Sequence, residues 1–157
     1  MAFEFTPENR TKFDAILTRY PVKRAAMLPA LWLAQRQHGW ISQEVMEYVG
    51  SLLGLSAAKV YEVVTFYTMF HLKPIGKYHF QVCRTLPCQL VGAEAISSHL
   101  EKKLGVKIGE TSADGRFTLS EVECLGSCGT GPMLQLNDDY HENLTAEKLD
   151  ALIASLS

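Results

Sequence analysis

Apolar residues recur at helical spacing through the first part of the chain. The spacing predicts helices over residues 7–20, 24–38, 43–53 and 57–67. After a Pro- and Gly-containing joint at residues 71–77 the hydrophobic period changes. The sequence therefore predicts an all-helical N-terminal part and a C-terminal part of a different kind.

Residues that commonly begin or end helices support this division. Thr6 is expected to cap the first helix, and Ser42 and Ser56 the third and fourth. The second helix is expected to end at Gly39, although Pro29 should bend or break its first turns.

Beyond the joint, apolar and polar residues alternate with the period of a strand over residues 78–82 and again over 117–123. A helix is predicted between these strands, over residues 92–104. Residues 133–136 and a short segment near Tyr140 predict a hairpin. A last helix, capped by Thr145, follows. The predicted order is strand, helix, strand, strand, helix, which indicates an α+β domain.

Charge and the chain ends give further expectations. The 15 basic and 17 acidic side chains nearly cancel, so electrostatics favour neither nucleic acid nor an anionic membrane as a partner. The N-terminal sequence lacks the pattern of a secretory or organellar signal, which predicts a cytosolic protein. No apolar stretch approaches the roughly 20 residues of a membrane span, so we expect any membrane association to come through another subunit.

Four cysteines carry the candidate chemistry. They are spaced C-x4-C and C-x3-C with 35 residues between the pairs, and each is expected in a loop at the end of a strand. The four-residue gap resembles that of plant-type ferredoxins, whose thiolates bind two irons. Four thiolates also suit zinc, although structural zinc sites favour tighter two-residue spacing, and disulfides are rare in a reducing cytosol. The candidate ligands are Cys83, Cys88, Cys124 and Cys128.

Residues beside the cysteines fit an iron–sulfur cluster. Gly126 and Gly129 can adopt backbone angles closed to other residues and so turn amide groups toward sulfur. Thr85 and Ser127 are candidate hydroxyl donors that would shift a reduction potential. A C-x-x-C motif opening a helix is absent from the sequence, which disfavours a thiol-exchange enzyme.

Several segments resemble a known family. VVTFYTMFHLKPIGKYHFQVC, CRTLPCQLVG, DGRFTLSEVECLGSCGTGP and NDDYHENLT are similar to the 24 kDa subunit of respiratory complex I, NADH:quinone oxidoreductase, also called the NuoE family. The resemblance implies a four-helix bundle over residues 1–72 and a thioredoxin-like [2Fe–2S] ferredoxin domain over residues 73–157. It also implies that the four cysteines are the cluster ligands.

The resemblance implies one-electron transfer with a NuoF-like flavoprotein subunit that binds FMN and NADH. The chain alone is not expected to oxidise NADH, because it has no dinucleotide-binding glycine loop after a strand. We expect the helical segment to help dock that partner in a multi-subunit complex, cytoplasmic and peripheral to a bacterial inner membrane. Equivalent subunits of NAD-linked hydrogenases and formate dehydrogenases remain alternatives.

A DNA-binding regulator is the alternative from another class. Residues 41–67 can be read as a helix-turn-helix, which would make the protein an iron–sulfur transcription regulator. A recognition helix needs exposed polar and basic side chains, but residues 57–70 contain Lys59 as their single basic residue, with Glu62 beside it. The sequence therefore disfavours DNA binding.

Overall fold

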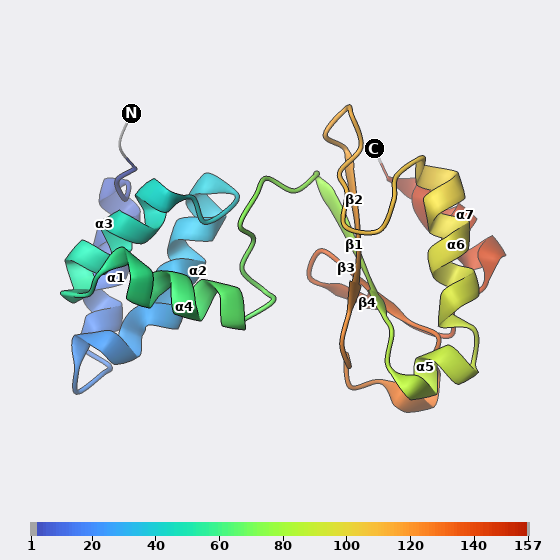
Figure 1. Ribbon diagram of the computed structural model, residues 1–157, viewed down its shortest axis with the longest axis horizontal. Helices are drawn as coiled ribbons and strands as arrows, with labels where there is room; N and C mark the ends of the chain where they lie inside the picture. Colours follow the sequence, from blue (N-terminus) through green and yellow to red (C-terminus); the bar gives the residue numbers. More distant parts are fainter. Residues whose placement is uncertain (1–2, 157) are drawn as a thin grey trace. The chain divides into compact units, whose positions relative to one another are not determined.

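The computed structural model describes residues 3–156, which divide into two compact units, one up to Pro74 and one from Ile75 onward (Figure 1). The first unit contains α1 (Pro7–Leu17), the 3-10 helix η1 (Lys23–Ala26), α2 (Met27–His38), α3 (Gln43–Leu53) and α4 (Ala57–Phe66). The second contains β1 (Tyr78–Cys83), α5 (Leu86–Leu90), α6 (Ala93–Leu104), β2 (Phe117–Val122), η2 (Cys128–Thr130), β3 (Leu134–Leu136), β4 (Asp139–His141) and α7 (Ala146–Ser155).

The helix starts follow the predicted caps, with one exception. The Thr6 hydroxyl accepts a hydrogen bond from the Asn9 backbone at 3.2 Å, and Ser42 accepts one from Val45 at 3.3 Å. Ser56 precedes α4, but its side chain makes no capping hydrogen bond. Helix α1 ends at Leu17, before the predicted end, so the capping prediction was correct for the first and third helices and wrong for the fourth.

The predicted helix over residues 24–38 is divided. A 3-10 turn, η1, precedes α2, which begins at Met27 and ends at Gly39, where φ is +91°. Pro29 is the third residue of α2 and does not break it, because the first backbone N–H groups of a helix have no partner within the helix. The expected disruption therefore lies upstream of the proline.

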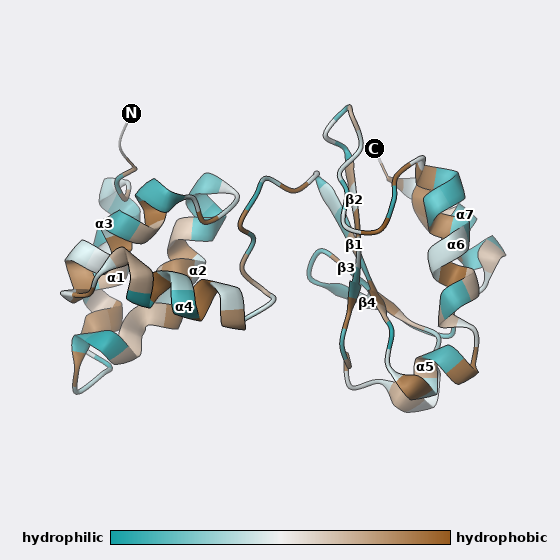
Figure 2. Ribbon diagram, viewed as in Figure 1, coloured by the Kyte–Doolittle hydropathy of each residue, from teal (hydrophilic) through white to brown (hydrophobic). Residues whose placement is uncertain are grey.

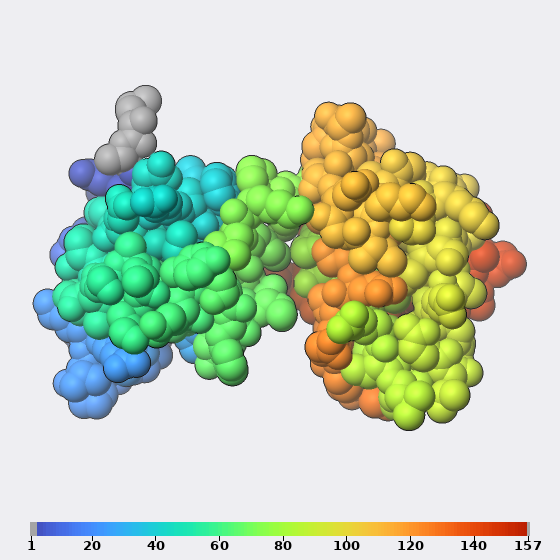
Figure 3. Space-filling view, in the orientation of Figure 1, coloured from blue at the N-terminus to red at the C-terminus, as the bar shows by residue number. Residues whose placement is uncertain are grey.

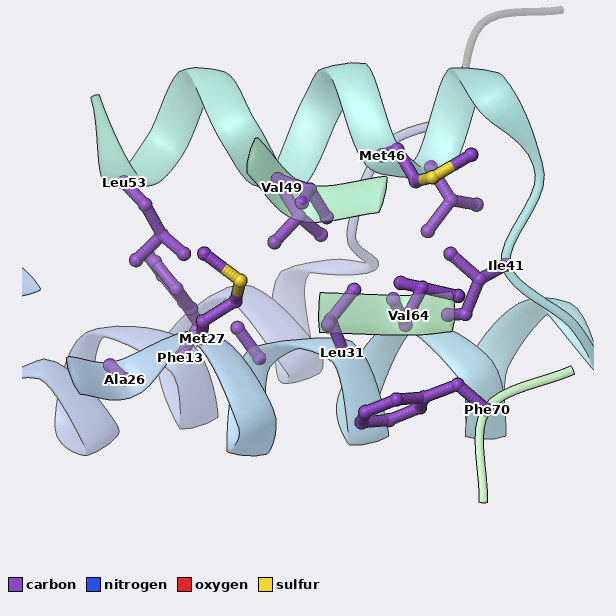
Figure 4. Close-up of a cluster of buried hydrophobic side chains, with 14 of the residues drawn as sticks. Phe13, Ala26, Met27, Leu31, Ile41, Met46, Val49, Leu53, Val64 and Phe70 are labelled. Atoms are coloured by element: carbon purple, nitrogen blue, oxygen red, sulfur yellow. The ribbon is translucent and has the colours of Figure 1, made fainter. Parts of the chain in front are cut away.

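Apolar side chains from all four helices form the core of the first unit. In Figure 4 the side chains of Met46, Val49 and Leu53 on α3 point toward α2, where Leu31 lies. Burying an aliphatic side chain contributes about 1.5–3 kcal/mol, so this core is the main stabilising term of the unit. Its largest fully buried side chains are Phe13, Leu31, Ile41, Val45, Val49 and Val60.

A buried glutamine fastens the chain after α4 to α2. The Gln35 side-chain amide donates to the Met69 carbonyl at 2.9 Å and accepts from the His71 backbone at 2.8 Å. Both ends of this amide are paired, which offsets the cost of burying it. The segment that leads toward the second unit is therefore held against the helical core.

No helix in residues 3–156 is by itself long and apolar enough to cross a bilayer. Helices α3 and α4 pass that test of length and composition only as a pair, and they are bent by 114° at their junction. Val45 and Val49 of α3, and Val60 and Val64 of α4, are buried in the core of the unit. The apolar composition of this pair is thus accounted for by packing within the protein.

The second unit is built on a four-stranded mixed sheet in the order β2-β1-β3-β4. β1 pairs with β2 in parallel and with β3 antiparallel, and β3 and β4 form the predicted hairpin. Helices α6 and α7 lie on one side of this sheet in Figure 1. Phe80, Leu119 and Leu134 are fully buried in the core of the unit.

Candidate metal centre

The sheet topology brings the two cysteine-bearing segments together. Cys83 is the last residue of β1 and pairs in parallel register with Val122, the last residue of β2. Cys124 follows two residues later. Because parallel strands end at the same edge of a sheet, both segments leave it there, as Figure 1 shows.

The prediction that all four cysteines lie in loops was wrong for three of them. Cys83 belongs to β1, Cys88 lies inside the five-residue helix α5, and Cys128 begins the 3-10 helix η2. The sequence held an unused signal for α5, because Thr85 stands at its N-cap position and a proline lies in its first turn. Such a short segment has too few residues to show a helical period.

Three contacts tie the segments to each other. The Arg84 guanidinium donates to the Glu123 carboxylate at 2.7 Å, which links the residue after Cys83 to the residue before Cys124. The Arg84 backbone donates to the Val122 carbonyl at 3.0 Å, and the Cys83 backbone donates to the Met133 carbonyl at 3.2 Å. The cysteines are therefore held near one another by the backbone as well as by an exposed ion pair.

Gly131 shows how closely the second segment approaches the first. A Cβ atom built on Gly131 would lie 3.4 Å from the Cys88 sulfur and 3.0 Å from a methyl carbon of Val91. Both contacts are tight, so a side chain here would press on α5 and on the thiol that it carries. The absence of a side chain at Gly131 allows this close approach.

The four thiols form a buried pair and an exposed pair. Cys83 and Cys88 are 2% and 1% exposed, whereas Cys124 and Cys128 are exposed, and all four are free thiols. In Figure 3 the orange atoms, which include the second cysteine segment, form part of the surface of their unit. Three large apolar side chains next to Cys88, those of Leu86, Leu90 and Val91, are also exposed.

The thiols within each pair interact. Burial raises the pKa of the Cys88 thiol to about 11, and the neighbouring Cys83 thiol adds to the rise. A hydrogen bond with Cys124, and then the charge of Cys124, raise the pKa of the Cys128 thiol, and Cys83 contributes from the other pair. Ionising neighbouring thiols together is thus costly unless a cation shares the site.

Cys83 differs from its neighbours in its hydrogen bonds. Burial pushes the pKa of the Cys83 thiol upward, but hydrogen bonds from the Thr85 hydroxyl and from the backbones of Thr85 and Leu125 leave that pKa below its ordinary value. The Thr85 oxygen lies 3.2 Å from the Cys83 sulfur. These groups stabilise the thiolate, the form that binds metal.

The glycine and hydroxyl predictions have mixed outcomes. Gly126 has a φ of +82°, as expected, and its backbone N–H donates to the Cys124 sulfur at 3.3 Å. Gly129 does not adopt a positive φ. The Ser127 hydroxyl hydrogen-bonds to Thr130 and to the Glu142 carboxylate. The prediction of a special backbone angle was therefore confirmed for Gly126 and wrong for Gly129.

The donor set fits two metal ions. Within residues 3–156 no three His, Cys, Asp or Glu side chains form a group that could hold a single metal ion. The thiols instead come as two interacting pairs joined by cross-contacts. A [2Fe–2S] cluster takes two thiolates at each iron, and its two ferric ions supply the positive charge that neighbouring thiolates need.

Comparison with known proteins places the chain in a family. The family model described as thioredoxin-like [2Fe-2S] ferredoxin matches residues 13–157. The chain belongs to the thioredoxin-like [2Fe–2S] ferredoxin family. This membership, together with the two thiol pairs, makes the [2Fe–2S] cluster its cofactor, and the α+β ferredoxin fold is as expected.

Two relatives of this ferredoxin are named as E subunits of NADH-quinone oxidoreductase. The one from Rhizobium meliloti, the second E-type protein of that organism by its name, is 50% identical over 146 residues, which cover 93% of this chain and 87% of the relative. The one from Rickettsia conorii is 50% identical over 157 residues, covering 98% and 94%. The resemblance found in the sequence is thereby confirmed.

A solved structure shares the fold. An NAD+-reducing [NiFe]-hydrogenase in the air-oxidized state aligns with a TM-score of 0.73 at 22% identity, over 82% of this chain and 22% of the hydrogenase chain. The same hydrogenase in its H2-reduced state gives a TM-score of 0.72. At this identity the likeness concerns the fold alone.

Proposed function

We propose that this ferredoxin is the [2Fe–2S] electron-transfer subunit of an NADH:quinone oxidoreductase, complex I. It exchanges single electrons with the FMN of a NuoF-like flavoprotein subunit, which also binds NADH. The observation that carries the proposal is the convergence of four thiols in two pairs, in a chain 50% identical to proteins named as E subunits of this enzyme. The protein is part of an oxidoreductase and is not catalytic alone.

Cys83 and Cys88 would bind one iron and Cys124 and Cys128 the other. The bound cluster supplies a carrier for one electron. The polypeptide holds the thiolates in place through β1, α5 and the Arg84–Glu123 pair, and burial of the first pair excludes water from that side. Backbone and hydroxyl donors to sulfur set how readily negative charge is accepted.

The first experiment is the EPR spectrum of the anaerobically purified chain before and after dithionite, with iron and acid-labile sulfide determined on the same sample. A rhombic signal that arises on reduction, with about two irons and two sulfides per chain, supports the proposal. Zinc without sulfide in a strictly anaerobic sample contradicts it, since four thiolates also suit a structural zinc site.

We infer that the two units are domains, residues 1–72 forming a four-helix bundle and residues 73–157 the ferredoxin domain. The bundle helps to dock the flavoprotein. Support comes from exposed aromatic side chains at the end of α4, where Phe66 is 77% exposed and packs edge-on against Tyr67. Exposed apolar groups of this size are typical of surfaces that bind proteins.

Docking is tested by measuring binding to the purified flavoprotein partner after removal of residues 1–70, and with Phe66→Ser. Val22→Ser, which changes an exposed apolar side chain at the N-cap of η1, is the matched control. Weaker binding by the deletion and by Phe66→Ser, with unchanged binding by Val22→Ser, fits the proposal. Unchanged binding by the deletion contradicts it.

In the cell we expect the chain to be cytoplasmic and held at the bacterial inner membrane by other subunits of the complex. The expected fractionation is release from membranes under conditions that dissociate the complex. The hydrogenase likeness is limited to the fold, so it gives no functional support to the hydrogenase alternative. The regulator alternative loses its recognition charge, because Lys59 of α4 pairs with Glu62 at 2.8 Å.

A further inference from the structure

Thr85 has a side chain that is not used as its position in the fold would suggest. It stands at the N-cap of α5, with extended backbone angles, yet its hydroxyl makes no capping hydrogen bond. Thr145 at the N-cap of α7, by contrast, accepts from the Lys148 backbone at 3.3 Å. The Thr85 hydroxyl oxygen instead lies 3.2 Å from the Cys83 sulfur.

The direction of this hydrogen bond follows from the chemistry of the ligand. Between a thiol and a hydroxyl either group can donate, but a metal-binding Cys83 is a thiolate and has no proton. The Thr85 hydroxyl must then be the donor. The Cys83 residue is 2% exposed, so water competes weakly and the hydrogen bond is stronger than it would be at the surface.

Thr85 is also fixed in place. Its carbonyl accepts a hydrogen bond from the Gln89 backbone at 3.0 Å in the first turn of α5, and β1 ends two residues before it. The short connection between β1 and α5 therefore holds the hydroxyl against the sulfur without a long flexible side chain. A donor held in this way needs little reorganisation when the charge on sulfur changes.

Ser127, the other hydroxyl predicted to face the cluster, is engaged elsewhere. Its Oγ hydrogen-bonds to Thr130 and to the Glu142 carboxylate. Its place beside Cys128 in the sequence matches that of a potential donor, but the structure directs it away to the segment after β4. The two hydroxyls therefore have different roles.

We propose that Thr85 is a positioning residue that raises the reduction potential of the cluster by donating a hydrogen bond to the Cys83 thiolate. This inference rests on the proposed function. When the cluster accepts an electron from a reduced flavin, part of the added negative charge resides on the cysteine sulfurs. A donor aimed at sulfur stabilises that reduced form more than the oxidised form, so its removal lowers the potential.

The test uses the full-length chain with its cluster. The variants are Thr85→Val, which keeps the shape and loses the hydroxyl, Thr85→Ser, which keeps the hydroxyl, and Thr145→Val as the matched N-cap control. Iron and sulfide are determined for each, and midpoint potentials are measured by EPR-monitored titration with dithionite. Thr85→Ala provides a second hydroxyl-free variant if Thr85→Val loads poorly.

We expect Thr85→Val or Thr85→Ala to lower the midpoint potential and Thr85→Ser to keep it near the wild-type value. Thr145→Val should lower the thermal midpoint and leave the potential unchanged. A wild-type potential in the hydroxyl-free variants, or an equal shift in Thr145→Val, overturns the role of Thr85. A wild-type chain with zinc and no sulfide overturns the proposed function itself, which separates the two failures.

Discussion

The two cysteine pairs differ in how the protein holds them. Cys83 and Cys88 are buried on regular elements, the end of β1 and the helix α5. Cys124 and Cys128 are exposed in a segment that contains Gly126 and Gly129. The first pair is therefore set by the packing of the unit, while the second lies on a segment whose glycines allow adjustment.

This difference separates two tasks. The buried pair fixes the position of the site in the fold, and its polar neighbours are few and directed at sulfur. The exposed pair lies at the surface, where an electron-transfer partner can approach. Figure 2 shows apolar colouring at the ends of α5, beside the buried pair, which fits a surface covered by another protein in the complex.

The largest expected effect breaks the cluster itself. Cys→Ser at any of the four positions replaces a soft thiolate by a harder oxygen that ionises less readily, so every variant should change the visible and EPR spectra. Cys88→Ser should retain less cluster than Cys128→Ser, because the buried backbone cannot move to suit the new ligand. Iron and sulfide contents of anaerobic preparations measure this. Equal retention at both positions would contradict the division into a fixed and an adjustable pair.

The next effect concerns the metal-free chain. Cys88→Ser buries a hydroxyl where a thiol stood and should lower the free energy of unfolding by about 1–3 kcal/mol. Cys124→Ser changes an exposed side chain and should stay within about 0.5 kcal/mol of the wild type. Urea unfolding of the iron-free proteins measures both. A similar loss at Cys124 would show that burial does not distinguish the pairs.

The glycines of the exposed segment provide a matched comparison. Gly126→Ala places a side chain at a φ of +82° and should cost about 1–2 kcal/mol. Gly129→Ala meets no atom within 4 Å and has no positive φ, so it should be close to neutral. Thermal unfolding of both variants tests this. Equal destabilisation would mean that the strain lies in the segment as a whole.

The smallest effect is a pH dependence in the same segment. Hydrogen bonds from Ser127 and then Thr130 lower the pKa of the Glu142 carboxyl in the folded chain. The unfolded chain therefore binds the proton more readily, and the stabilisation is present above the unfolded pKa and is lost as the pH falls through the lowered folded value. Between about pH 5 and pH 3 the wild type should lose more stability than Glu142→Gln. Parallel pH profiles for the two metal-free proteins would contradict this.

Much of the fold could be predicted from local sequence. The helix caps at Thr6 and Ser42, the ends at Gly39 and Gly105 and the alternation in β1 are properties of a few neighbouring residues. The short helix α5 was missed because five residues give no measurable period. The 3-10 turn before α2 was missed because its hydrophobic positions continue those of the helix.

By itself the sequence determined which residues can bind iron, since the number, type and spacing of the cysteines are chemical facts of the chain. Tertiary structure decided which thiols are paired, which pair is buried and which hydroxyl faces a sulfur. Thr85 and Ser127 have similar places beside a cysteine, but one is held against sulfur by the turn into α5 and the other is taken by Glu142. The physical reason is that a hydrogen-bonding side chain pairs with the donors and acceptors that the fold brings within its reach, and these come from residues distant in sequence.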